Sequence, residues 1–210
     1  IMQMLDAYHR DDPATAWSIG QSWLGEDAAD QRGRCGGLNV MGVAQWYAGD
    51  LASAQSCWQE SATLATYIDW PYSICLNLFG TAHVHYLCGE LESAEETCRQ
   101  IFAISACRDQ PVLSSGYAHM LMAKTLYDRN DLDGARANIR AARRIAETGN
   151  ERSLAMHADM ALARIEVVGG QRAEGIERAR RCFSEFCTDP QYRKSFDEAR
   201  TLMAQIWLLA

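Results

Sequence analysis

Apolar residues recur along the chain at the spacing of one face of an α-helix, three and then four residues apart. No segment shows the sustained alternation or the Asn-Gly turn that would indicate a β-hairpin. The pattern therefore predicts an all-α protein. The clearest stripes are Leu51, Ala54 and Trp58; Leu132, Ala135, Ile139, Ala142 and Ile145; and Ile176, Ala179, Phe183 and Phe186.

One phrase returns about every forty residues: YAGDLASAQ at 47–55, LCGELESAE at 87–95, YDRNDLDGA at 127–135 and, more faintly, VVGGQRAEG at 167–175. Each copy holds Gly or Asn at one common position, namely Gly49, Gly89, Asn130 and Gly170. Gly adopts the left-handed backbone region freely and Asn tolerates it, so this position is expected to end a helix. An Asp or Glu follows in the first three copies, where it suits the start of the next helix. Each unit is thus predicted to be a helix, a tight turn and a second helix.

A unit of this length cannot bury its apolar face alone, so neighbouring units must stack. Small residues before and after each turn would let the paired helices approach closely; they are Gly42, Ala82, Ala123 and Ala163 before it, and Ala54, Ala94, Ala135 and Gly175 after it. We expect a right-handed superhelical solenoid forming a single domain over residues 1–210. The expected repeats are approximately 1–29, 30–70, 71–110, 111–150 and 151–189, with a partial repeat at 190–210.

The two ends of the sequence suggest a piece of a longer protein. The first residue is Ile1, and the last predicted helix has no partner helix after it. We expect Ile206, Trp207 and Leu209 to be exposed there, and the chain to self-associate through this apolar surface.

Charge and cysteine usage narrow the classes of partner. The chain has 210 residues and a formal net charge of −7. An acidic surface repels phosphate, so we expect no direct contact with nucleic acid and none with an anionic membrane. No apolar run of about twenty residues and no signal-peptide pattern is visible. The eight cysteines stand singly without a C-x-x-C motif, which favours free thiols and a cytoplasmic location.

The small-residue and turn pattern resembles tetratricopeptide (TPR) repeats, with units longer than the usual ~34 residues. The segments LNVMGVAQWYAGDLASAQ and GYAHMLMAKTLYDRNDLDGARANIRAARRIAETGN are similar to the TPR region of MalT-like regulators, the large ATP-dependent transcription activators of the LuxR type. In that family the phrase L-Y-x-x-N-D-L-x-x-A, here Leu126 to Ala135, recurs with a helix rich in Arg and Ala behind it. The resemblance covers roughly residues 30–210.

The resemblance implies a sensor region that receives a small inducer or an inhibitory protein and controls self-association of the activator. The family's nucleotide-binding module and helix-turn-helix are not found here, since the chain has neither G-x-x-x-x-G-K-[ST] nor a basic recognition helix. We therefore expect a non-catalytic segment that senses a ligand and self-associates. The alternative is a stand-alone TPR adaptor that binds a peptide or protein partner.

Aligned first-helix positions are expected to line a concave groove. Flat aromatic faces combined with a few polar groups suit a small-molecule effector, such as a sugar or an aromatic compound, or an extended peptide. The aromatic rings could instead fill space between helices, and the charged groups could be ordinary solvated side chains. The predicted groove residues are Asn39, Trp46, Phe79, His83, Tyr86, Tyr117, Lys124, Tyr127, Asp128 and Arg164.

No metal, cofactor or catalytic site is expected. His85 and Cys88 could share a helix face, but the four ligands of a structural zinc site are not in evidence. The motifs G-x-S-x-G and H-E-x-x-H and the dinucleotide-binding fingerprint do not occur. The short basic stretches RRIAE and RARRC are predicted to be solvated helix faces.

Overall fold

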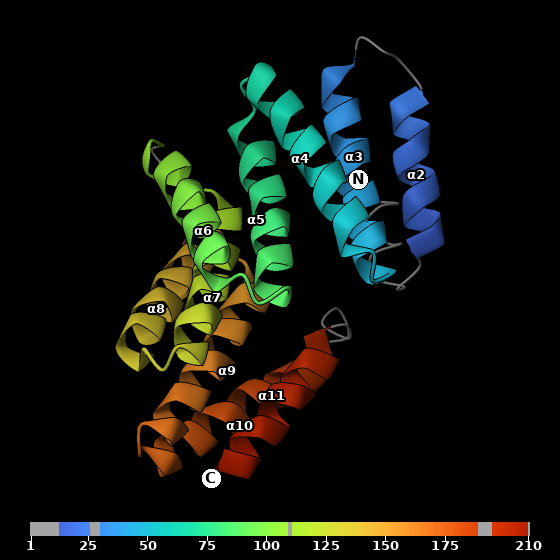
Figure 1. Ribbon diagram of the computed structural model, residues 1–210. Helices are drawn as coiled ribbons and strands as arrows, with labels where there is room; N and C mark the ends of the chain where they lie inside the picture. Colours follow the sequence, from blue (N-terminus) through green and yellow to red (C-terminus); the bar gives the residue numbers. More distant parts are fainter. Residues whose placement is uncertain (1–12, 26–29, 109–110, 189–194, 210) are drawn as a thin grey trace. The chain divides into compact units, whose positions relative to one another are not determined.

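A computed structural model describes residues 13–25, 30–108, 111–188 and 195–209, and these ranges contain α-helices and no strand (Figure 1). This confirms the all-α, helical-repeat prediction. The helices are α2 (Pro13–Gly25), α3 (Gln31–Tyr47), α4 (Leu51–Tyr67), α5 (Pro71–Leu87), α6 (Leu91–Ala106), α7 (Leu113–Asp128), α8 (Leu132–Thr148), α9 (Arg152–Val168), α10 (Arg172–Thr188) and α11 (Ser195–Leu209).

The helices group into two compact units, residues 1–114 (unit 1) and 115–210 (unit 2). In unit 1, α2 packs on α3, α3 on α4, α4 on α5 and α5 on α6. In unit 2, α8 packs on α9, α9 on α10, and α11 on both α9 and α10. One continuous right-handed solenoid over the whole chain remains a prediction.

The four predicted turn residues all have a left-handed backbone. Their φ angles are +83° at Gly49, +78° at Gly89, +62° at Asn130 and +89° at Gly170. The backbone N–H after the turn residue bonds back into the finished helix, as from Asp131 to the carbonyl of Leu126 at 2.8 Å. These bonds satisfy carbonyl groups that the end of a helix leaves without partners.

Acidic side chains begin the second helices in two different ways. Asp50 caps α4 by accepting a hydrogen bond from the Ser53 N–H at 3.0 Å, and Asp131 caps α8 in the same way. Hydrogen bonds from Ser53 also lower the pKa of Asp50. Glu90, in the third such position, makes no capping bond; its carboxylate contacts Nδ1 of His85 at 2.5 Å.

Small residues allow the close helix contacts that the sequence predicts. Ala54, Ala94 and Ala135 are fully buried beside the preceding helix. Gly42 on α3 and Gly80 on α5 both contact the indole of Trp58 on α4: a Cβ at either glycine would lie 2.5 Å from an indole atom. Trp58 therefore fills the space between two first helices, and its Nε1 donates to the carbonyl of Asn39 at 3.2 Å.

The expectation for the last helix is wrong at one residue. Ile206 is only 1% exposed, because α11 packs against α9 and α10 and places Ile206 in a core with Met156 and Met160. Trp207 and Leu209 are exposed as expected, and Leu208 is 88% exposed. No helix in the described ranges is both long and apolar enough to cross a bilayer.

Candidate functional site

Three predicted groove residues come together in unit 1, on the neighbouring first helices α3 and α5. Trp46 of α3 lies over His83 of α5 with ring centroids 5.2 Å apart, and Phe79 stacks on His83 at 6.0 Å and 28°. Tyr47 meets Trp46 edge to face at 4.9 Å. Phe79 and His83 are one helical turn apart on α5, so both side chains lie on the same face of that helix. We call Trp46, Tyr47, Phe79 and His83 the aromatic cluster.

The aromatic cluster packs against the core on one side and is partly exposed to solvent. Trp46 packs against the core formed by Ala54, Trp58 and Val84, so one part of the indole is buried. The rings of Trp46, Phe79 and His83 are half-buried, and Tyr47 is 38% exposed. Filling space between helices thus accounts for part of each ring, and the remaining aromatic surface can stack against another molecule.

A second contact between predicted residues lies in unit 2. The guanidinium of Arg164 on α9 sits 4.0 Å from the ring centroid of Tyr127 on α7, which is a cation–π contact. The buried Nε of Arg164 makes no hydrogen bond within the described part of the chain. Lys124 and Asp128 are exposed on α7 near Tyr127 in sequence. This arrangement offers an aromatic face, a fixed cation and two exposed charges.

Asn39 is a buried residue that takes part in a hydrogen-bond network. It is 8% exposed, and its Nδ2 donates to Oδ1 of Asn77 at 2.9 Å. Asn77, fully buried, donates in turn to Ser61 Oγ at 2.8 Å and to the Ser73 carbonyl at 2.7 Å. Ser61 then donates to the Cys35 carbonyl at 2.9 Å. This buried network joins α3, α4 and α5, and sequence reasoning did not identify it.

The predicted residues therefore divide between the two units. Trp46, Phe79 and His83 are in contact in unit 1, and Tyr86 is half-buried on the same helix, α5. In unit 2, Tyr127 and Arg164 are in contact and Tyr117 is half-buried. A single groove extending from Phe79 to Asp128 remains a prediction.

Thiols and possible metal ligands are dispersed. All eight cysteines are free. Among the described residues, no group of three or more His, Cys, Asp and Glu side chains is placed to hold a metal ion. His85, the first residue of the H-x-x-C pair, is directed to Glu90.

Comparisons with known proteins agree with the helical-repeat fold. The sequence family described as the MalT-like TPR region matches residues 22–209. No curated protein matches the chain. Solved structures that share the fold at low identity include the following two. A kinesin light chain with nearly identical TPR-like repeats from Podosopora anserina is 14% identical with a TM-score of 0.57, covering 90% of this chain and 92% of that one. BtubC (BKLC) from P. vanneervenii is 11% identical with a TM-score of 0.67, covering 99% and 83%.

Proposed function

Because the chain belongs to the MalT-like TPR family, we propose that it is the ligand-sensing and self-association segment of a MalT-like transcription regulator. Its TPR-like repeat fold supports a protein-interaction or scaffold role. In the proposed role the segment performs no catalysis and makes no contact with DNA. It receives an effector on its first helices, and the effector's preference for one arrangement of the repeats is passed on to the regulator.

The observation that carries the proposal is the aromatic cluster. Trp46, Phe79 and His83 come from two repeats, and their rings contact one another at centroid distances of 5.2 and 6.0 Å. A ligand that stacks on these rings contacts both repeats at once. Binding would therefore favour one relative position of α3 and α5, which is what a sensor of this kind requires.

The chemistry of the rings suggests a ligand with flat or weakly polar faces. Aromatic side chains stack well on sugar rings and on aromatic compounds, and His83 can add a hydrogen bond. In unit 2, Arg164 is held over Tyr127 at 4.0 Å, where it can orient a polar group of the same ligand class. A neutral oligosaccharide, a small aromatic compound and an extended peptide are the three candidates.

A ligand screen on the whole chain tests the proposal. Neutral oligosaccharides, small aromatic acids and short extended peptides are screened for a rise in Tm, and hits are measured by calorimetry. Trp46→Ala and Phe79→Ala are expected to weaken binding of a hit by roughly tenfold to hundredfold, the loss of about 1–3 kcal/mol for a stacked aromatic residue.

Tyr67→Ala is the matched control, because Tyr67 is a tyrosine that is 84% exposed on the second helix α4. It should leave the affinity unchanged. Normal binding by both first-helix variants, with a loss in the Tyr67 variant, would place recognition on the second helices and refute the proposal.

A stand-alone adaptor that binds a protein partner would have the same TPR-like fold, so the fold does not distinguish an adaptor from a sensor segment. The domains that flank this segment in its natural polypeptide distinguish the two roles. A regulator requires a nucleotide-binding module before the repeats and a helix-turn-helix after them.

A further inference from the structure

Unit 2 contains a cleft of about 440 Å³ lined by residues of α8, α9 and α10. Four arginines of α8 and one of α10 line it: Arg136, Arg140, Arg143, Arg144 and Arg178. Its acidic lining residues are Glu147 and Glu166. We call this the arginine cleft. Its arginines all come from the second helices α8 and α10, and none of the predicted groove residues lines it.

Internal ion pairs engage two of the five arginines. Arg178 forms a fork-to-fork pair with Glu166, with Nε–Oε2 at 2.9 Å and Nη2–Oε1 at 2.8 Å. Arg143 lies 3.4 Å from Glu147 and 3.4 Å from Asp159, too far for a short charge-assisted bond. The buried Nε of Arg143 makes no hydrogen bond within the described residues.

The other three arginines have no carboxylate partner among the described residues. In the described part of the chain, no ion pair is formed by Arg136, Arg140 or Arg144. They are spaced four residues apart on α8, so they form a row along one helix face with a rise of about 6 Å per step. Like charges at this spacing repel one another, which an anion in the cleft would relieve.

Helix packing does not require these arginines, as the corresponding groove of unit 1 shows. That groove, of about 510 Å³ between α4, α5 and α6, includes Ala62, Thr63, Ile74 and Leu78 in its lining and has no charged side chain. When α4 and α8 are aligned on their turn residues Gly49 and Asn130, the four arginines correspond to Gln55, Gln59, Ala62 and Thr63.

The charge of the chain is also unevenly divided. Residues 1–114 include fourteen acidic and five basic residues, whereas residues 115–210 include thirteen acidic and fifteen basic residues. With His neutral, the formal net charge is therefore −9 for residues 1–114 and +2 for residues 115–210. The basic stretches RRIAE and RARRC are not only solvated helix faces, because Arg143 and Arg144 of the first share a cleft with Arg178 of the second.

We propose that the arginine cleft is a binding site for a small phosphate-bearing molecule. A phosphate group presents several oxygens to neighbouring guanidinium forks, whereas a single carboxylate is satisfied by one or two. The cleft volume is within the ~300–1,000 Å³ of small-molecule sites. Leu162 is its one apolar lining residue, so charge and not stacking would dominate recognition. This site is independent of the proposed effector site on the first helices.

Calorimetry of the whole chain with inorganic pyrophosphate tests the proposal. We expect a dissociation constant below about 100 µM at low salt, weakening as salt is added. The double variant Arg140→Gln, Arg144→Gln should bind about a hundredfold more weakly, and Arg140→Lys alone should lose less than Arg140→Gln. Both side chains are exposed, so circular dichroism should show an unchanged fold.

Arg99→Gln is the matched control, because Arg99 occupies in α6 the position that Arg140 occupies in α8. It should bind pyrophosphate normally. The proposal is overturned if pyrophosphate does not bind, if the double variant binds as well as the unaltered chain, or if Arg99→Gln loses as much affinity. It is also overturned in favour of an acidic peptide partner if hexaglutamate binds the cleft more tightly than pyrophosphate. Trp46→Ala should leave pyrophosphate binding unchanged. The pyrophosphate experiment can therefore refute the phosphate site without refuting the proposed effector site.

Discussion

The side-chain Nδ2 of Asn39 donates a hydrogen bond to Oδ1 of Asn77 at 2.9 Å, and both side chains are buried. The bond connects α3 to α5, the first helices of neighbouring repeats, which also carry the aromatic cluster. Because the amide is used in this way, Asn39 holds neighbouring repeats together in the structure, and we propose the aromatic cluster alone as the recognition surface of unit 1.

Removing one partner of this amide pair should destabilise the fold. Asn77→Ala removes the acceptor of the buried Asn39 Nδ2 and the donor to the buried Ser61 Oγ, which is expected to lower the free energy of unfolding by about 1–3 kcal/mol. Urea unfolding followed by circular dichroism measures the change. A change below about 0.5 kcal/mol, the range of ordinary surface substitutions, would mean that the network contributes little.

Adding a methyl group beside Trp58 should also destabilise unit 1. A Cβ at Gly42 would lie 2.5 Å from Nε1 of Trp58, so Gly42→Ala forces the buried indole to move. Overpacking of this kind typically costs about 1–3 kcal/mol, more than the roughly 1 kcal/mol that Ala gains over Gly inside a helix. At half-buried Gly36 a Cβ would lie 3.1 Å from the half-buried ring of Trp23, so Gly36→Ala should cost less. Equal loss in both variants, measured by thermal unfolding, would contradict this account.

His119 should make the stability of the fold depend on pH. Its Nδ1 lies 2.8 Å from Oδ1 of Asn138, whose Nδ2 donates to the Gly134 carbonyl, so the imidazole is the donor. Burial lowers the pKa of His119 below 6.5. As the pH falls below 6.5, the unfolded chain takes up this proton before the folded one, so the free energy of unfolding falls. Above 6.5 both states are neutral and the contribution is fully present.

Comparing the pH dependence of the unaltered chain with that of His119→Gln isolates this contribution. Urea unfolding at pH 7.5 and at lower pH should give a smaller decrease in the variant. Identical decreases would show that His119 is not the responsible group.

Thiol reactivity should follow burial. Burial raises the pKa of Cys98 and of Cys182 to about 12, so almost none of either thiol is ionised near neutral pH. Cys88, Cys107 and Cys187 are exposed. A thiol reagent should modify these three rapidly in the native chain, and all eight cysteines after denaturation without reductant. Rapid native modification of Cys98, located by mass spectrometry, would contradict the packing of α6.

Much of the fold could be predicted because its signals are local. The turn at Asn130 needs only a residue that tolerates positive φ between two amphipathic stretches, and its neighbours in sequence provide both. Ala54 and Ala135 were predicted as contact points because the repeats place them at equal distances from their turns.

The site was less predictable because it depends on distant partners. Asn39 is a buried structural residue, and not a groove residue, because it bonds to Asn77, which lies 38 residues away in the sequence. Periodicity cannot show that Ile206 faces inward, because that depends on how α11 packs on α9 and α10. The arginine cleft likewise requires Arg178 of α10 to meet the arginines of α8 across α9.

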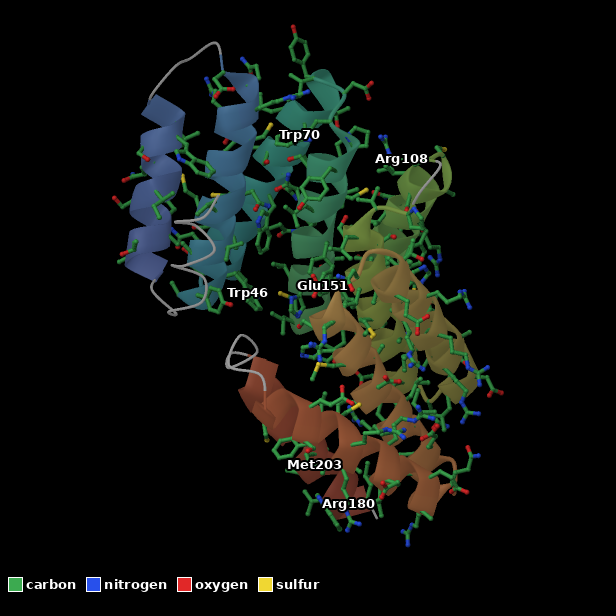
Figure 2. The ribbon with its side chains drawn as sticks, turned by 180° about the vertical axis from the view of Figure 1, so that it is seen from behind. Trp46, Trp70, Arg108, Glu151, Arg180 and Met203 are labelled. Atoms are coloured by element: carbon green, nitrogen blue, oxygen red, sulfur yellow. The ribbon has the colours of Figure 1, made fainter. Side chains whose placement is uncertain are left out.

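Fluorine NMR of the chain labelled with 5-fluorotryptophan tests the central claim most directly, that an effector binds over the aromatic cluster. Each of the six tryptophans gives its own signal, and substitution by Phe assigns them. Figure 2 shows Trp46 and Trp70 at opposite ends of the helices of unit 1, so the two report on separate surfaces. Saturation with the compound that raises Tm most should shift the Trp46 signal and leave those of Trp70 and Trp207 in place. A Trp46 signal that stays unmoved at saturation would contradict the account.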